Sequence, residues 1–334
     1  MHTIIIAEAG VNHNGSLDMA YRLCDAALAA GVDIVKFQTW KTEKILTSTA
    51  GMADYQKKNT GLDQSQYAMV EALELGYDQF EKIKRYCSTI GIEFLSTPDE
   101  EESLDFLIDT LGIQKIKVGS GEVTNIPYLR RIAQKHLPVI LSTGMSNLAE
   151  VARAYDELMA HGASQVSLLH CTTNYPCPMD EVNLNAMKTL KDAFKTVVGY
   201  SDHTLGVEIP IAAVAMGAEI IEKHFTLDKN LPGPDHAASL NPAELKHMVV
   251  GIRNIELAMG DGIKRPNKSE LEIKSVVRRS VVAAKEIKCG ETFNEENICV
   301  KRAGPGGITA EYWDIIVGKI AKRNYNIDEL IELI

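Results

Sequence analysis

The stretch TVVGYSDHTLGVEIPIAAVAMGAEIIEKH, residues 196–224, contains two short β-branched runs, Thr196–Asp202 and Glu219–His224, on either side of a helix-like segment. A polar cluster follows the first run, and Gly217 stands just before the second. Glycine is the usual residue at the left-handed position that ends a helix. A strand, a helix and a second strand in this order predict a βαβ unit with parallel strands.

The same unit recurs along the whole first part of the chain. Apolar residues at helical spacing separate the runs, for example over 17–27 and 148–159. Eight βα units over about 260 residues predict a TIM (β/α)8 barrel. A doubly wound open sheet is the alternative, and the lack of a Gly-x-Gly-x-x-Gly motif after the first run disfavours it. The eight runs are Ile4–Glu8, Ile34–Gln38, Ile92–Thr97, Lys115–Ser120, Val139–Thr143, Val166–Thr172, Thr196–Asp202 and Glu219–His224.

One spacing is irregular, because the gap between Gln38 and Ile92 is much longer than the others. It contains the polar segment Lys41–Gln66, which we interpret as a long excursion over the carboxyl ends of the strands, where such insertions build sites. Two helices, Gln66–Leu75 and Tyr77–Ile90, are predicted to follow it.

The chain has 334 residues, 45% hydrophobic and 24% charged, which is typical of a globular protein. Its formal net charge of −10 argues against nucleic acid as the main partner. The apolar opening Ile4–Ala7 is cut by Glu8, so neither a signal peptide nor a membrane-spanning helix is expected. The six cysteines form no Cys-x-x-Cys pair, and we interpret them as reduced thiols of a cytoplasmic enzyme.

The pattern changes near Gly260. Residues 261–274 are linker-like, with glycine, proline and charge, and residues 275–334 contain short alternating runs separated by turns. We therefore predict a barrel domain over 1–260, a linker over 261–274 and a small, mostly-β module over 275–334. A module of this size is expected to act as a docking or lid element.

Polar residues stand at the end of all eight runs, which is more than solvation alone predicts. The active site of a TIM barrel lies at these strand ends. The residues are Glu8, Lys36, Gln38, Ser96, Thr97, Lys117, Ser120, Ser142, Thr143, His170, Thr172, Ser201, His203, Glu222 and His224.

Two features of this set indicate what the residues could bind. His203 and His224 end neighbouring runs, so their imidazoles are placed to share one ion such as Mn²⁺, Co²⁺ or Zn²⁺; structural roles in the core are the alternative. Lys36 and Lys117 stand among hydroxyl residues, as in a phosphate or carboxylate cradle. The alternative for the lysines is structural ion pairing with Glu8 and Glu122.

A metal beside an anion site leaves two classes of chemistry open. One is carbon–carbon bond formation on a phosphorylated substrate, with the metal polarising a carbonyl group. The other is Schiff-base aldol chemistry from Lys36, Lys117 or Lys223.

Nine segments together resemble the sialic acid synthase family, in order and over essentially the whole chain. From residue 275 the tail resembles that family's antifreeze-like (SAF) module, with Val300–Arg302 as its recognisable segment. The resemblance implies condensation of phosphoenolpyruvate with an N-acyl hexosamine to a nine-carbon 2-keto acid and phosphate. The segments are AEAGVNHNG (7–15), VKFQT (35–39), LSTP (95–98), GSGE (119–122), LSTGM (141–145), HCTTNYP (170–176), GYSDHT (199–204), IEKHFT (221–226) and GPD (233–235).

The resemblance also implies roles for individual residues. The sugar is expected to contact Gln38, Tyr175, Glu222 and Asp235, while His203 and His224 bind a divalent metal. Mn²⁺ is the expected ion, with Mg²⁺ or Co²⁺ as alternatives. Glu8, or as second candidate Glu122, is expected to activate water or move protons. The residues implied to bind phosphoenolpyruvate are Lys36, Thr97, Lys117, Ser120, Ser142, Asn174 and Ser201.

The family resemblance further implies a domain-swapped homodimer, in which Arg302 reaches the N-acyl group in the partner's barrel. The acceptor is N-acetylmannosamine or its 2,4-diacetamido-2,4,6-trideoxy analogue, giving N-acetylneuraminate or legionaminate. Asp99 departs from the family pattern, because relatives commonly have phenylalanine there. Two other hypotheses stay open, a Schiff-base aldolase and a non-catalytic sugar-binding protein.

Overall fold

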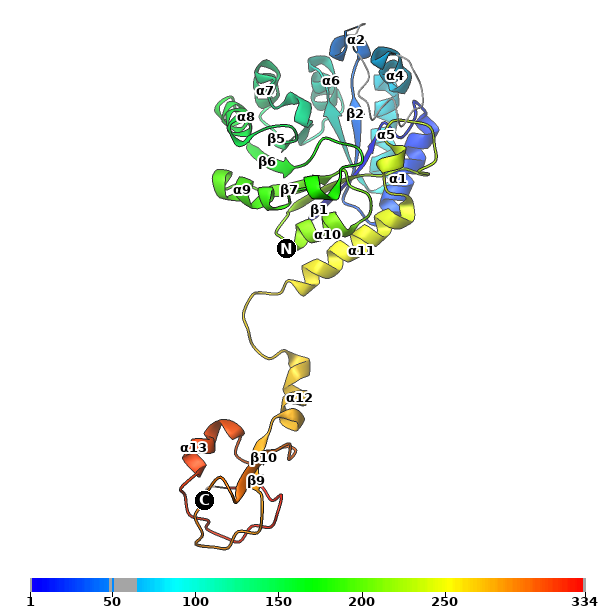
Figure 1. Cartoon of the computed structure of the whole chain (residues 1–334). Helices are drawn as coiled ribbons and strands as arrows, with labels where there is room; N and C mark the ends of the chain where they lie inside the picture. The colour runs from blue at the N-terminus through cyan, green and yellow to red at the C-terminus, as the bar shows by residue number, and fades with distance from the viewer. Residues whose placement is uncertain (1, 48–49, 51–64, 333–334) are drawn as a thin grey trace. The chain divides into compact units, whose positions relative to one another are not determined.

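The computed structural model describes residues 2–47, 50 and 65–332, and the chain divides into two compact units, 1–260 and 261–334. The first unit is built on one parallel sheet of eight strands in the order β3-β2-β1-β8-β7-β6-β5-β4. Strands β3 and β4 also contact each other, which closes the sheet into a barrel ringed by helices (Figure 1). The predicted TIM barrel is confirmed. The strands are β1 Ile4–Gly10, β2 Ile34–Thr39, β3 Glu93–Pro98, β4 Ile116–Val118, β5 Pro138–Ser142, β6 Gln165–His170, β7 Val198–Asp202 and β8 Ile220–His224.

Helices follow the strands and cover the outside of the barrel. Local signals in the sequence set their ends: Ser16 caps α1 by accepting a hydrogen bond from the Met19 N–H, and Asn147 and Glu150 form a capping box on α8. The helices are α1 Leu17–Ala30, α2 Thr42–Ile45, α4 Gln66–Leu73, α5 Tyr77–Ile90, α6 Glu101–Asp105, α7 Ile126–Ala133, α8 Leu148–Ala160, α9 Asn185–Phe194, α10 Glu208–Ala215 and α11 Pro242–Ala258.

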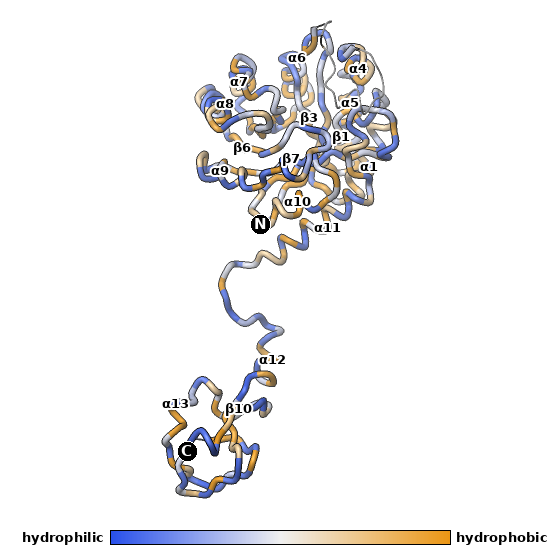
Figure 2. The backbone as a smooth tube through the Cα atoms, in the orientation of Figure 1, coloured by the Kyte–Doolittle hydropathy of each residue, from blue (hydrophilic) through white to orange (hydrophobic). Residues whose placement is uncertain are grey.

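Gly217 and four other glycines that stand before strands, Gly31, Gly91, Gly112 and Gly162, have left-handed backbone conformations. Their φ values range from 67° at Gly112 to 113° at Gly162, so a side chain would be strained there. Helix α11 is amphipathic, since it buries Leu245, Met248 and Ile252. Figure 2 shows hydrophobic and hydrophilic segments alternating along this helix.

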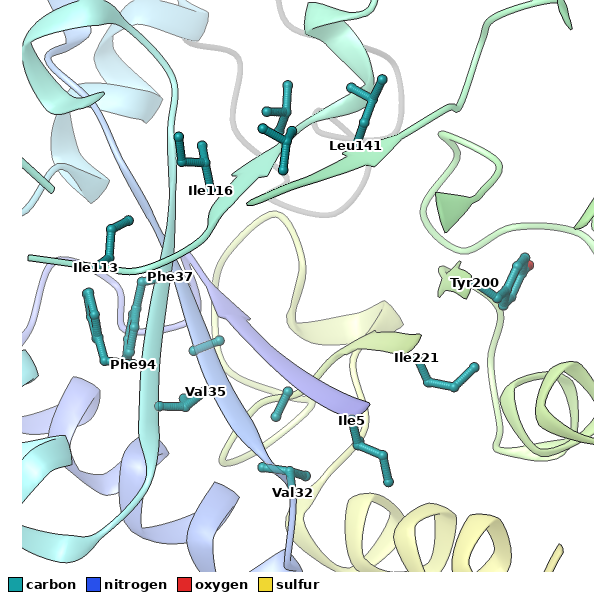
Figure 3. Packing of buried hydrophobic residues seen from close by; sticks show 14 of the residues in the cluster. Ile5, Val32, Val35, Phe37, Phe94, Ile113, Ile116, Leu141, Tyr200 and Ile221 are labelled. Carbon is teal, nitrogen blue, oxygen red and sulfur yellow. The ribbon is translucent and has the colours of Figure 1, made fainter. Parts of the chain in front are cut away.

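Each strand directs alternate side chains to opposite faces of the sheet. The outward set, including Ile5, Val35 and Ile221, packs against the helices in the main hydrophobic core, part of which Figure 3 shows. The inward set forms a separate buried cluster that fills the barrel, made of Ile6, Ile34, Leu95, Ile140, Leu169 and Ile220. The residues two and four positions later on the same strands therefore also point into the barrel, at its carboxyl end.

The excursion after β2 begins with the short helix α2 and ends in α4, two residues shorter than predicted; α5 has its predicted bounds. The Glu74 carboxylate accepts hydrogen bonds from the N–H and hydroxyl of Thr42 and ion-pairs with Lys41. This contact ties the end of α4 to the start of α2. The remainder of the predicted excursion, 48–49 and 51–64, lies outside the described residues.

The second unit contains α12 Lys268–Val277, the antiparallel pair β9 Ser280–Ala283 and β10 Ile298–Lys301, and the short helix α13 Trp313–Ile316. Its small core includes Val281, Phe293 and Tyr325. The predicted linker differs from the structure, because Asn267 and Glu270 form a capping box that starts α12 within it. Among residues 2–47, 50 and 65–332, no helix is long and apolar enough to cross a membrane.

Candidate active site

The inward alternation of the strands continues past the barrel core and produces a polar cavity at the carboxyl end, here called the inner cavity. On β1 and β2, Ile6 is followed by Glu8, and Ile34 by Lys36 and Gln38. The inner cavity occupies about 490 Å³. Its lining residues are Glu8, Lys36, Gln38, Thr97, Asp99, Lys117, Gly119, Ser120, Ser142, Cys171, Tyr175, Ser201, His203, Glu222 and His224.

Two buried ammonium groups face this cavity. Lys36 Nζ lies 2.6 Å from Glu8 Oε2 and donates a hydrogen bond to Thr97 Oγ1 at 3.1 Å. Lys117 Nζ donates to Ser142 Oγ at 2.8 Å. The alternative of structural ion pairing named Glu8 and Glu122: Lys36 does pair with Glu8, whereas the carboxylate near Lys117 is that of Glu222 and not of Glu122.

Glu222 links the two lysines. Its carboxylate oxygens lie 3.7 Å from Lys36 Nζ and 3.6 Å from Lys117 Nζ, and one of them accepts a hydrogen bond from Ser201. Burial acts to raise the pKa of Glu222, but Lys117 and Lys36 outweigh it and hold that pKa below its usual value. Glu222 is therefore ionised and keeps both ammonium groups in place.

The protonation states favour entry of an anion. Burial opposes the charged form of Lys36, but Glu222 and Glu8 outweigh burial and raise its pKa, so the ammonium stays charged. Burial raises the pKa of Glu8 to about 7, against the opposing effect of Lys36. Glu8 is thus partly neutral near pH 7, and less negative charge competes with an incoming anion for Lys36.

His203 and His224 lie side by side at the end of β7 and β8, with ring centroids 5.5 Å apart. His203 Nδ1 lies 2.6 Å from the Thr172 carbonyl, so Nδ1 carries the proton and Nε2 keeps its lone pair. His224 Nδ1 is buried, has no hydrogen-bond partner among the described residues and lies 3.8 Å from Asp235 Oδ2. Burial lowers the pKa of both imidazoles, which keeps them in the neutral form that binds metals.

Lys223 does not reach the cavity, although it stands between two residues that do. Strand alternation turns it outward, where its fully buried ammonium lies 2.5 Å from Asp202 Oδ2 and donates to the Thr204 carbonyl. Asp202 and Lys223 pair directly across β7 and β8. This ion pair braces the two strands behind the histidines and removes Lys223 from the candidates for Schiff-base chemistry.

A second cavity of about 760 Å³, the outer cavity, opens from the first. Gln38, Asp99, Tyr175 and His224 line both cavities, so these four side chains lie at the boundary between them. The remaining lining residues are Val11, Trp40, Ile45, Met69, Val70, Leu73, Thr173, Pro234 and Asp235.

The loop that carries Asp235 follows β8 and is held by the loop after the neighbouring strand β1. Asn14 donates to the Pro232 carbonyl at 2.9 Å, and its amide oxygen lies 3.0 Å from His236 Nε2. Gly233 permits this contact, since a Cβ there would lie only 2.6 Å from the His236 ring. We call Asn14 and His236 the loop clamp; Asn14 contacts Pro232 and His236, which flank Asp235 in the sequence.

Seven predicted residues are not brought into either cavity: Ser96, Thr143, His170, Thr172, Asn174, Glu122 and Arg302. Asn174 lines neither one, and its backbone N–H donates to the Thr172 carbonyl. Glu122 lies outside the inner cavity and accepts a hydrogen bond from Asn125 at 2.6 Å. Arg302 is exposed on the second unit.

The sequence analysis missed several residues that the structure places at the site. Asp99 and Cys171 line the inner cavity because they continue the inward series of β3 and β6. That alternation was a usable signal for both. The loop clamp and the apolar residues of α4 gave no signal, because their contacts join distant segments.

Comparison with known proteins agrees with this geometry. Residues 23–264 match the NeuB family and residues 278–332 match the SAF domain. The chain is 52% identical to an N,N'-diacetyllegionaminic acid synthase of Campylobacter jejuni, over 98% of each chain. It is 46% identical to a protein of that name from Legionella pneumophila, over 96% of this chain and 91% of the relative.

Among solved structures, one similar protein is the N-acetylneuraminic acid (sialic acid) synthetase of Leptospira borgpetersenii, crystallised in complex with citrate. It shares 34% identity and superposes with a TM-score of 0.72, covering 83% of this chain and 93% of its own. The family that the motifs resembled is confirmed by sequence and by fold. The chain belongs to the NeuB family and carries a C-terminal SAF domain.

Proposed function

We propose that this protein condenses phosphoenolpyruvate with 2,4-diacetamido-2,4,6-trideoxymannose, giving N,N'-diacetyllegionaminate and phosphate. One observation carries the proposal: a cavity with two buried ammonium groups opens, past a pair of neutral histidines, into a second cavity of sugar size. The names of the two legionaminic acid synthases support the choice of acceptor.

The inner cavity suits phosphoenolpyruvate, a small molecule with a phosphate and a carboxylate. Lys36 and Lys117 supply charge, while the hydroxyls of Thr97, Ser142 and Ser201 supply hydrogen bonds at fixed positions. Because these groups come from different strands of a rigid barrel, they are organised before the substrate binds.

His203 and His224 fit a divalent metal, since His224 has a buried nitrogen without a hydrogen-bond partner and both rings are held neutral. Within the described part of the chain, no group of three or more His, Cys, Asp or Glu side chains is placed to hold a metal ion. The protein would therefore supply two imidazoles and leave the other positions to oxygen ligands. When bound, such a metal polarises the aldehyde of the acceptor.

The residues of the chain position the reacting atoms. C3 of phosphoenolpyruvate forms a bond to the aldehyde carbon, and the aldehyde oxygen takes up a proton to become a hydroxyl. Water adds to the oxocarbenium carbon C2, and Glu8, adjacent to Lys36, accepts the proton of that water. The C2–O bond to phosphate then breaks while the C2 hydroxyl transfers its proton to the leaving phosphate, which gives the 2-keto acid and free phosphate. Lys36 and Lys117 stabilise the negative charge of the departing phosphate.

Schiff-base chemistry remains the competing mechanism, and Lys117 is its best candidate because burial lowers the pKa of that ammonium. Borohydride reduction in the presence of pyruvate distinguishes the two. We expect no covalent adduct by mass spectrometry, whereas an adduct on Lys117 would contradict the condensation mechanism.

The function itself is tested by phosphate release from phosphoenolpyruvate with each acceptor in turn. We expect release that depends on the trideoxy acceptor, is abolished by EDTA and is restored by Mn²⁺ or Co²⁺. His203→Ala and His224→Ala are expected to remain folded and to lose the restored activity. Sugar binding without any phosphate release would instead support the non-catalytic sugar-binding hypothesis.

A further inference from the structure

One side of the outer cavity is apolar. Trp40 follows β2, Ile45 ends α2, and Met69, Val70 and Leu73 lie on one face of α4. We call these five residues the apolar wall. The only hydrogen-bonding group among their side chains, Trp40 Nε1, already donates to Thr42 Oγ1 at 3.1 Å. The wall therefore offers no hydrogen bond to a molecule in the cavity.

The polar lining of the same cavity comes from other elements. Gln38 and Asp99 follow β2 and β3, while Tyr175, His224 and Asp235 belong to the β6 and β8 side. Among the described residues, the Asp99 carboxylate makes no hydrogen bond or ion pair, so it is available to a donor group of a ligand. The occupant must accordingly have one polar edge and one apolar edge.

We propose that the apolar wall selects the acceptor by packing against a deoxygenated C6 methyl group. This inference rests on the proposed function and adds a specificity-determining surface to it. Under the proposed function, His224 and the phosphoenolpyruvate site hold the aldehyde end of the sugar where the two cavities meet, since His224 lines both. Among the described residues, a hydroxyl group on the wall-facing end would be desolvated without a partner, whereas a methyl group loses nothing on burial there.

The wall is held in place by contacts independent of any ligand. Glu74 joins the end of α4 to Thr42 and Lys41, and Ser65 caps the start of α4 through the Ala68 N–H. Met69 is buried against the barrel, with 4% of its surface exposed. A preformed surface discriminates between ligands without a cost of ordering.

The test compares two acceptors that differ only at C6, 2,4-diacetamido-2,4,6-trideoxymannose and its 6-hydroxy counterpart. For the full-length enzyme we expect kcat/KM to favour the 6-deoxy sugar by about 10- to 100-fold. Val70→Thr replaces a methyl group by a hydroxyl of nearly equal size, and Leu73→Asn adds a larger polar group. Each is expected to reduce that preference by about 10-fold, with the KM of phosphoenolpyruvate unchanged. Ala72→Ser is the control, because Ala72 is exposed on the same helix.

A binding measurement separates this inference from the proposed function. The chain has two tryptophans, Trp40 and Trp313, so a Trp313→Phe variant leaves Trp40 as the sole fluorophore. We expect the 6-deoxy sugar to change Trp40 emission without phosphoenolpyruvate, and at lower concentration than the 6-hydroxy sugar. If the protein binds the 6-deoxy sugar more tightly but releases no phosphate, the proposed function is wrong and the proposed role of the apolar wall stands. If phosphate is released with equal kcat/KM for the two sugars, the proposed role of the apolar wall is wrong and the proposed function stands. If the protein neither binds the sugars nor releases phosphate, both proposals are wrong.

Discussion

Glu8 and Glu122 differ in what surrounds their carboxylates. Glu8 lies in the inner cavity against Lys36, whereas Glu122 lies outside the cavity and accepts from Asn125. We predict that Glu8→Gln lowers kcat by about 10²- to 10⁴-fold, the usual range for a general base, with little change in substrate KM values. Glu122→Gln is the matched control and should stay within twofold. Initial-rate kinetics of both variants decide between them, and the reverse ranking would make Glu122 the base.

Burial of Asp99 gives a prediction about stability. Burial raises the pKa of this carboxyl from 3.8 to about 7, against the opposing charge of Lys36. Between these values the folded protein keeps a proton that the unfolded chain has lost, so stability falls as pH rises through the window. Asp99→Asn removes this effect. We expect it to raise the free energy of unfolding by about 1–3 kcal/mol at pH 8 and by much less at pH 4.5.

Urea denaturation at the two pH values measures that difference. Asp180→Asn is a suitable control, because Asp180 is exposed and lines neither cavity. An equal stabilisation by Asp99→Asn at both pH values would show that the ionisation of Asp99 is not the cause.

Much of the site was predictable residue by residue, because a strand has a period of two. Once the runs were known as barrel strands, Lys36, Lys117, His203 and His224 were all assigned to the strand ends, and the structure places them in one cavity. The same rule, applied strictly, would have excluded Lys223 and included Asp99. The position of Glu222 between Lys36 and Lys117 depends on the register between strands, which no single run contains.

At the scale of elements, the loop clamp predicts how the β8 loop affects the acceptor. Asn14 holds Pro232 and His236, the residues on either side of Asp235, and Ser239 Oγ donates to the Asp235 carbonyl at 2.7 Å. Asn14→Ala should loosen this loop, raising the acceptor KM by about 10-fold with less than a twofold change for phosphoenolpyruvate. The estimate assumes loss of about 1.4 kcal/mol of hydrogen bonding.

Hydrogen exchange supplies a second measurement for the clamp. Amides in 231–239 should exchange faster in Asn14→Ala than in the parent enzyme, and those in the other loops should not. Asn230→Ala is the control, since Asn230 is exposed in the same loop and bonds only to Asp228 through its side chain. Unchanged exchange together with an unchanged acceptor KM would leave Asn14 without a positioning role.

Strand and helix signals were strong enough to predict the barrel, because hydrophobic periodicity recurs along the units and a glycine precedes five of the eight strands. The element signals were incomplete in two places. Glu74 ends α4 earlier than its apolar pattern suggests, because its carboxylate is bonded to Thr42. Helix α12 forms within a segment whose glycine, proline and charge favoured a linker, because a capping box starts it at Asn267.

At the scale of the whole molecule, Arg302 tests the predicted domain-swapped dimer. It is exposed on the SAF unit, and its guanidinium is suited to an amide carbonyl or a sugar oxygen. We predict that Arg302→Ala raises the acceptor KM by about 10- to 150-fold, the loss expected for a charged hydrogen bond, with little effect on phosphoenolpyruvate. Its action across subunits could be proposed only from the family resemblance, since nothing in this chain's own strands or helices encodes it.

Mixed dimers provide the measurement. A chain with Arg302→Ala and a chain with Lys117→Ala should partly restore activity together, because one site in each heterodimer then has both intact residues. Activity of the mixture no greater than the sum of the two variants, together with an unchanged acceptor KM for Arg302→Ala, would leave the SAF unit without a catalytic role. The homodimeric state and a cytoplasmic location of the protein also remain predictions.

The central claim is that the anion cavity and the sugar cavity act together to break the C–O bond of phosphoenolpyruvate. ³¹P NMR of the reaction with phosphoenolpyruvate labelled with ¹⁸O at the bridging oxygen tests it directly. We predict acceptor-dependent release of phosphate that retains the ¹⁸O label, together with a nine-carbon 2-keto acid whose C2 oxygen is unlabelled and comes from water. Unlabelled phosphate, with the label kept on the product, would show cleavage of the P–O bond and contradict the account.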